Sequence, residues 1–177
     1  MENTVPSEED IVKPVNDHVS RILDQWGRER PDLDASPMAI FGNMTRLADA
    51  LGREISAVQR RFGLGEGEFD VLATLRRSGE PFELSPGDLA ATTMVTSGAV
   101  SKRVDRLESA GLVTRERCSH DGRARLVRLT PEGRERIDRA VEAHLDNEHR
   151  LLAPLSESER AHLAAILQKW AGAVGDE

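Results

Sequence analysis

Basic side chains concentrate in one segment of a chain that is otherwise acidic. Between Thr96 and Arg136 there are ten lysines and arginines and six acidic residues, which gives this segment a net charge of +4. The whole chain carries −7, so the remaining residues carry −11. Guanidinium and ammonium groups gathered in one place can bind a polyanion such as a nucleic acid. A solvated arginine-rich surface has the same composition, so the positions of the residues must decide between the two interpretations.

The side chains after Thr96 have the distribution expected of a helix that reads DNA. Val100, Val104 and Leu107 recur at helical spacing and predict the face that packs on the rest of the domain. Hydroxyl and basic side chains occupy the other positions, where they suit base edges and phosphates. The candidates for DNA contact on this helix are Ser97, Ser101, Lys102 and Arg106.

Further arginines belong to a predicted β-hairpin that follows this helix. Arg115 lies on its first strand, and Arg123 lies in the polar turn between the strands. The minor groove of DNA has the most negative potential and attracts arginine side chains at such a hairpin tip. The agreement of charge, element order and helix caps favours a DNA-binding face over a merely solvated hairpin.

Other reactive groups are weaker candidates. Cys118 lies in the same turn, where Arg115 and Arg117 could activate its thiol, but we favour an unreactive surface cysteine. His144 and Glu148 share a helical face, although the sequence offers no third metal ligand beside them. There is no phosphate-binding loop, nucleophile elbow or paired-carboxylate motif. We therefore expect no enzymatic activity, no cofactor and no metal.

Helix caps and apolar spacing predict the elements that position these residues. Ser36-Pro37, Ser85-Pro86, Thr130-Pro131 and the Ser156/Glu159 pair predict helix starts, and Gly111 predicts a helix end. The predicted helices span 15–29, 36–62, 66–77, 87–92, 96–110, 130–152 and 157–174, and the predicted strands span 112–117 and 124–129. A helix, a turn, a helix and then a β-hairpin is the order of a winged helix-turn-helix.

Length and composition exclude several classes of protein. A chain of 177 residues buries a core without cross-links, and its single cysteine excludes a disulfide framework or a zinc site built from several thiolates. No apolar run approaches the roughly 18 residues of a membrane span, and the acidic first residues do not resemble a signal peptide. We expect a soluble, cytoplasmic protein that binds no membrane.

Several motifs in the sequence resemble the MarR family of transcriptional regulators. They are EFDVLA at 68–73, SGAVSKRVDRLE at 97–108, GLV at 111–113, DGR at 121–123 and VRLTPEG at 127–133. The resemblance extends over residues 36–174. It implies a homodimeric winged-helix regulator that binds a pseudopalindromic operator and releases it on binding a small ligand. It also implies that Asp121 orients basic side chains of the wing and that Arg123 enters the minor groove.

The helix predicted at 15–29 makes the sequence similar to the urate-responsive branch of that family. The resemblance implies a ligand site formed by Trp26, Asp70, Arg77 and Arg103. Asp70 and Arg77 lie nearly two helical turns apart and so share a face, and arginine forks with an aromatic ring suit a planar anion. Core packing of Trp26, a structural Asp70–Arg77 pair and a phosphate contact by Arg103 remain alternatives. Urate, other purines and polycarboxylates all fit this chemistry.

The predicted fold class is mainly α with a small β-hairpin wing, a winged helix-turn-helix that dimerises through its N- and C-terminal helices. Residues 1–35 are expected to form an extension with the added helix, and 36–177 the MarR-type domain. Within that domain we expect the winged helix at about 64–130 and dimerisation helices at about 36–62 and 131–174. The predicted function is a ligand-responsive DNA-binding repressor, with double-stranded DNA, a small anion and a second copy of the chain as partners. A winged-helix protein-interaction module and a MarR-type regulator without small-molecule sensing remain the alternatives.

Overall fold

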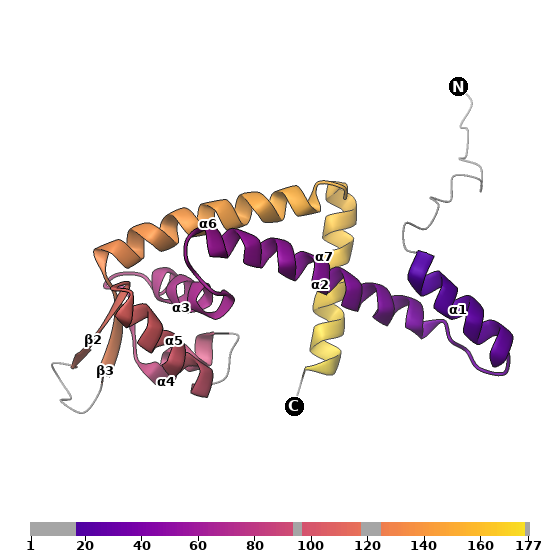
Figure 1. Ribbon diagram of the computed structural model, residues 1–177, viewed down its shortest axis with the longest axis horizontal. Helices are drawn as coiled ribbons and strands as arrows, with labels where there is room; N and C mark the ends of the chain where they lie inside the picture. The colour runs from indigo at the N-terminus through magenta and orange to yellow at the C-terminus, as the bar shows by residue number, and fades with distance from the viewer. Residues whose placement is uncertain (1–16, 94–96, 118–124, 176–177) are drawn as a thin grey trace, which may run out of the picture. The chain divides into compact units, whose positions relative to one another are not determined.

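The computed structural model describes residues 17–93, 97–117 and 125–175, which form helices and one small sheet (Figure 1). The chain divides into two compact units, the first ending at Gly52 and the second beginning at Arg53. The helices are α1 (Asp17–Glu29), α2 (Pro37–Arg61), α3 (Glu66–Arg77), α4 (Pro86–Thr92), α5 (Ser97–Ser109), α6 (Pro131–Leu152) and α7 (Glu157–Val174). The strands are β1 (Glu83–Leu84), β2 (Val113–Arg117) and β3 (Arg125–Leu129).

The first unit contains α1 and most of α2. Val19 of α1 is buried, and its side chain lies 3.2 Å from the place that a Cβ on Gly42 of α2 would take, so the missing side chain lets the helices approach. Between the helices the Arg30 guanidinium donates to Asp32, and this bond holds the pKa of the Asp32 carboxyl below its ordinary value. Much of the apolar surface of this unit remains exposed.

The core of the second unit surrounds α3. In Figure 1, α3 lies between α6 on one side and the α4–α5 pair on the other. Val100, Val104 and Leu107 of α5 are each only 2% exposed, which confirms the packed face predicted for this helix. They join a single apolar cluster with Leu72 and Leu75 of α3.

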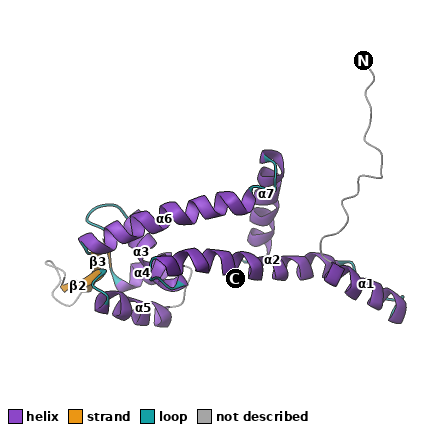
Figure 2. Cartoon of the chain, turned by 45° about the horizontal axis from the view of Figure 1, so that its top comes forward, coloured by secondary structure: helices purple, strands orange, loops and turns teal. Residues whose placement is uncertain are grey.

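The sheet has three antiparallel strands in the order β1-β3-β2, and Figure 2 shows β2 and β3 beside α5. The sequence predicted a two-stranded hairpin, and the structure corrects this by adding β1. Glu83 of β1 lies opposite Arg128 of β3 and accepts hydrogen bonds from its guanidinium. A strand of two residues shows no periodicity, so only its pairing with β3 reveals it.

The helix caps follow the predicted signals. The Ser85 hydroxyl accepts the Asp88 N–H at the start of α4, and the Thr130 hydroxyl accepts the Gly133 N–H at the start of α6. At α7 the Ser156 hydroxyl accepts the Glu159 N–H while the Glu159 carboxylate accepts the Ser156 N–H, which is the predicted capping box. Gly111 has a φ of 72° just beyond α5, in the left-handed conformation that favours glycine.

Candidate nucleic-acid interface and anion site

The surface of α5 opposite its packed face carries the basic and hydroxyl side chains. Ser101, Lys102 and Arg106 are all exposed, and Ser97 begins the helix. The Arg106 guanidinium lies 3.5 Å from Glu68 of α3, but its side chain is 70% exposed, so this ion pair is weak. Lys102 and Arg106 therefore retain the positive charge that a phosphate backbone requires.

Arg115 of β2 has different surroundings from the arginine and lysine of α5. Its guanidinium pairs with Asp105 and Glu108, both on α5. Burial lowers the pKa of Arg115, but the hydrogen bonds to these two carboxylates outweigh that effect and raise it above the ordinary value. Arg115 thus joins β2 to α5 and neutralises two acidic side chains of that helix.

The tip of the wing, with Asp121, Arg123 and Cys118, lies outside the described residues. The ladder that leads to it ends at the pair Arg117–Arg125, whose Cα atoms are partners across the hairpin. Two basic residues therefore flank the predicted minor-groove tip.

Two of the predicted ligand residues, Asp70 and Arg77, lie on α3 as expected. Asp70 is half-buried, whereas Arg77 is exposed and its Nη2 donates to the carbonyl of Thr92 at 2.7 Å. Thr92 is the last residue of α4, so Arg77 contacts the helix-turn-helix directly. Thr74 lies between Asp70 and Arg77 on the same face of α3, and its buried hydroxyl has no hydrogen-bond partner. Sequence reasoning missed both Thr74 and the contact with Thr92.

Arg103, the third predicted ligand residue, leaves α5 on the side toward α3. Its guanidinium lies over Gly67 in the first turn of α3, and its Nη1 atom is buried without a hydrogen-bond partner. A buried cationic donor without an acceptor is costly, and an anion would satisfy it. The sequence predicted this inward direction but not the glycine beneath it.

Trp26, the fourth predicted ligand residue, belongs to α1 in the first unit. Its side chain is 40% exposed there, so it does not fill the core of that unit. The exposed part of the indole is available to a flat partner.

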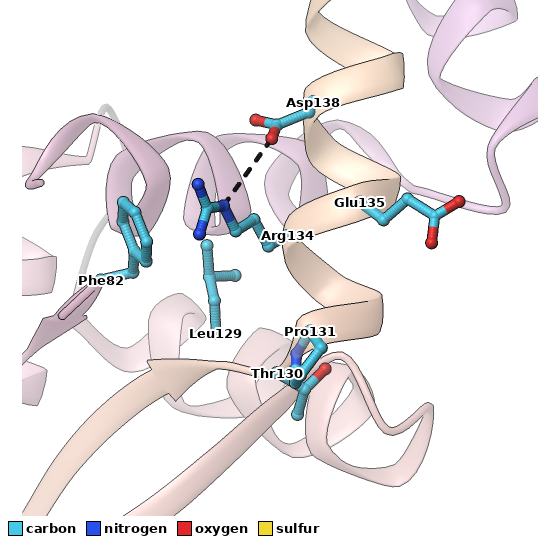
Figure 3. Close-up of a pocket in the computed structure, with 7 residues that line it drawn as sticks. All are labelled: Phe82, Leu129, Thr130, Pro131, Arg134, Glu135 and Asp138. Carbon is cyan, nitrogen blue, oxygen red and sulfur yellow. Dashed lines mark ion pairs between the residues drawn. The ribbon is translucent and has the colours of Figure 1, made fainter. Parts of the chain in front are cut away.

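The cavity drawn in Figure 3 contains none of the predicted residues. It measures about 460 Å³ and is lined by Phe82, Leu129, Thr130, Pro131, Arg134, Glu135 and Asp138. The guanidinium carbons of Arg76 and Arg134 lie 4.9 and 4.7 Å from the centre of the Phe82 ring, within the range of cation–π attraction. Asp138 accepts a hydrogen bond from Arg76 at 2.6 Å and lies 4.0 Å from Arg134, the pair marked in Figure 3. These charges already compensate one another and join α3 to α6.

The weaker candidates can also be placed. The Nε2 atom of His144 lies 3.2 Å from a Glu148 carboxylate oxygen, and the imidazole lies 4.8 Å from the Phe69 ring. Within the described ranges, no three His, Cys, Asp or Glu side chains come together as a metal site would require. None of the described helices is both long and apolar enough to cross a membrane.

Comparisons with known proteins agree with this geometry. The MarR family model matches residues 62–124. The HTH-type transcriptional regulator PecS of Dickeya dadantii is 42% identical over 149 residues, which are 84% of this chain and 90% of that protein. The MarR family regulator Sco3205 of Streptomyces coelicolor, solved in complex with DNA, has a TM-score of 0.71 and 26% identity over 80% of this chain and 93% of its own.

A third protein shares the fold at lower identity. It is the organohalide-sensing regulator RdhR-CbdbA1625, solved in its 2,4-dichlorophenol-bound form, with a TM-score of 0.72 and 18% identity over 82% of this chain and 85% of its own.

The winged helix-turn-helix fold and these relatives define the class as DNA-binding transcriptional regulators. Within that class the chain belongs to the MarR family, because its family model matches and the chain is 42% identical to PecS over an alignment that covers nine-tenths of that relative.

Proposed function

We propose that this MarR-family protein is a homodimeric repressor that leaves a pseudopalindromic operator when a planar anion binds. The observation that carries the proposal is the position of Arg103. This residue belongs to the DNA-reading helix α5, yet its guanidinium turns onto α3 and buries a donor that has no partner. One side chain therefore links the candidate ligand residues to the candidate DNA interface.

On the DNA side, the two α5 helices of a dimer would enter successive major grooves, about 34 Å apart. The residues proposed to act in DNA binding come from α5 and the wing: Ser97, Ser101, Lys102, Arg106, Arg115 and Arg123, with Asp121 orienting the wing. Because Arg115 forms ion pairs with α5, we expect it to support DNA binding by holding the wing in position. The DNA complex of Sco3205 supports this role for a chain of the same fold.

On the ligand side, Arg77, Arg103 and Trp26 would supply guanidinium forks and an aromatic face to urate, another purine or a polycarboxylate. The anion would displace the Asp70 carboxylate and draw Arg103 toward itself. Because Arg103 is part of α5 and Arg77 holds the end of α4, both helices of the motif would move. The coupling is reciprocal, so the ligand must bind the DNA-bound protein less tightly.

Exposed apolar side chains support the homodimer. In the second unit they include Leu145 and Leu152 of α6 and Leu163, Ile166 and Leu167 of α7. In the first unit they include Ile40, Phe41 and Leu47 of α2. Apolar surface of this extent on helices is typical of a protein–protein interface.

Fluorescence anisotropy with duplex DNA from upstream of the gene tests the proposal. We expect tight binding that weakens steeply with salt, because each phosphate contact releases a counterion. Urate should release the DNA from the wild-type protein. DNA binding that no purine or carboxylate weakens would favour a MarR-type regulator without sensing. A failure to bind DNA would favour a protein-interaction module.

A further inference from the structure

Gly67 occupies an unusual place in the first turn of α3. It is buried, and the Arg103 side chain covers the position where a Cβ would be. The Nη2 atom of Arg103 would lie 2.5 Å from that Cβ, and its Nε and Cζ atoms would lie closer still. Real Cβ atoms do not tolerate such approaches, so Arg103 can lie here only because residue 67 has no side chain.

The same turn of α3 receives a second arginine of α5. Arg106 reaches Glu68, whose carboxylate also accepts the Gly65 N–H at the start of α3. Arg103 and Arg106 are three residues apart and lie on neighbouring positions of α5. The two contacts differ in kind: Arg106 is a largely exposed ion pair, whereas Arg103 is a half-buried steric fit.

We infer that Gly67 is a positioning residue for the DNA-reading helix. Its bare backbone seats the Arg103 guanidinium and thereby sets how α5 lies on α3. The seat is also where positive charge accumulates, because the first turn of a helix carries a partial positive charge and Arg103 has an unpaired donor there. Resting on the proposed function, an anion that draws Arg103 off Gly67 releases α5 from this position.

The atoms that a Cβ at residue 67 would meet lie at the end of a flexible side chain. Arg103 can therefore swing away, and Gly67→Ala should fold. In contrast, the corresponding atoms at Gly133 belong to the backbone of Leu112, which cannot move aside so easily. An alanine at residue 67 thus removes the seat without removing the helix.

A double-mutant cycle on the full chain tests the inference. Wild type, Gly67→Ala, Arg103→Ala and the double variant would be titrated with a duplex that the wild-type protein selected from a random DNA pool. We expect Gly67→Ala to weaken binding at least fivefold in the wild-type background and less than twofold in the Arg103→Ala background. Gly52→Ala is the matched control, because nothing lies within 4 Å of a Cβ at this helical glycine.

Equal effects of Gly67→Ala in both backgrounds, or no effect in the wild type, would overturn the inference. If Gly67→Ala fails to fold, circular dichroism of the double variant decides: recovery of the fold by Arg103→Ala supports the seat, and failure of both variants contradicts it. A urate titration of the same proteins separates the two proposals. If urate does not release the wild-type protein from DNA, the proposed urate response is wrong. The double-mutant cycle on DNA binding still decides the role of Gly67 in that case.

Discussion

At the scale of single residues, four basic side chains of similar type have different surroundings. Lys102 and Arg106 are exposed on α5, Arg115 is bound by two carboxylates, and Arg103 lies over Gly67. The contribution of a cation to DNA binding depends on whether its charge is already compensated and whether it can reach a phosphate. Net charge alone therefore overstates the number of direct DNA contacts in this segment.

Salt dependence should separate these roles. We expect Lys102→Ala and Arg106→Ala each to reduce the slope of log affinity against log salt by about 0.9, the value for one phosphate contact. Arg115→Ala should weaken binding for another reason, because it frees two carboxylates on the DNA-reading helix. Adding Asp105→Asn to Arg115→Ala should then restore part of the affinity. If Arg115→Ala lowers the slope as Lys102→Ala does, and Asp105→Asn restores nothing, Arg115 contacts phosphate directly.

Sequence reasoning predicted the types of residue at the site better than their partners. Helical spacing correctly predicted the packed face of α5 and the inward lean of Arg103, since both depend on local geometry. It could not predict that Arg77 binds Thr92 or that Arg115 binds Asp105. These contacts join different elements, and only the tertiary fold determines them.

The contact with Thr92 changes what is expected of Arg77. Since Arg77 lies outside the basic segment, its sequence position predicts that Arg77→Ala spares DNA affinity and abolishes ligand-induced release. The hydrogen bond at the end of α4 adds an effect of about 0.5–1.5 kcal/mol, so we expect DNA binding to weaken roughly two- to tenfold as well. Arg76→Ala is the control, because Arg76 is the neighbour of Arg77 on α3 but its side chain binds Asp138 instead of Thr92. If urate releases the Arg77→Ala protein from DNA as readily as it releases the wild type, Arg77 is not part of the ligand site.

At the scale of elements, the caps fixed most boundaries in advance. The sequence predicted a helix at 66–77 and the structure has α3 at Glu66–Arg77, because Gly65 lies just before the helix and Gly79 lies just after it. Strand β1 was missed since its formation depends on β3. The sequence likewise showed Gly133 only as a member of the VRLTPEG motif and did not predict its contact. In the structure it lies against the Leu112 backbone at the start of α6.

We expect Gly133→Ala to destabilise the protein by about 1–3 kcal/mol or more. A Cβ at this position would meet the Leu112 carbonyl group, with its carbon at only 2.9 Å, so the backbone just before β2 and the start of α6 would have to separate. Denaturant unfolding measures the loss. Gly172→Ala is the control on α7, where a Cβ has open space and alanine should be neutral or slightly stabilising. Equal stability of the two variants would show that α6 can shift at no cost.

The α7 cap predicts a pH dependence. Hydrogen bonds from Ser156 lower the pKa of the Glu159 carboxyl below its ordinary value. A carboxyl with a lowered pKa in the folded state stabilises the fold above its unfolded pKa, and this stabilisation disappears as the pH falls through the folded value. The stability difference between wild type and Glu159→Ala should therefore shrink on acidification below about pH 4.5. A difference that stays constant from neutral to acidic pH would mean that the charge of Glu159 contributes nothing.

At the scale of the whole molecule, the winged helix was predictable because its order of elements and caps is read along the chain. The predicted division at residue 35 stays a prediction; by contacts the chain separates between Gly52 and Arg53, within α2. The terminal helices were predicted to form a dimer because their apolar residues exceed what one small domain can cover. The exposed apolar side chains of α2, α6 and α7 are consistent with that prediction.

Helix α7 provides the sharpest test of assembly. None of its residues is buried, yet Leu163, Ile166 and Leu167 form an apolar stripe on it and are 39%, 60% and 48% exposed. An amphipathic helix gains most of its stability by covering such a stripe, so we expect the second copy of the chain to cover it. Ile166→Glu should then dissociate the dimer and abolish binding to a two-half-site operator, whereas Gln168→Glu should preserve both. Because folding and association are coupled in such a dimer, dilution should lower the unfolding temperature of the wild type. Sedimentation that finds a stable, folded wild-type monomer at micromolar concentration would show that α7 does not hold two protomers together.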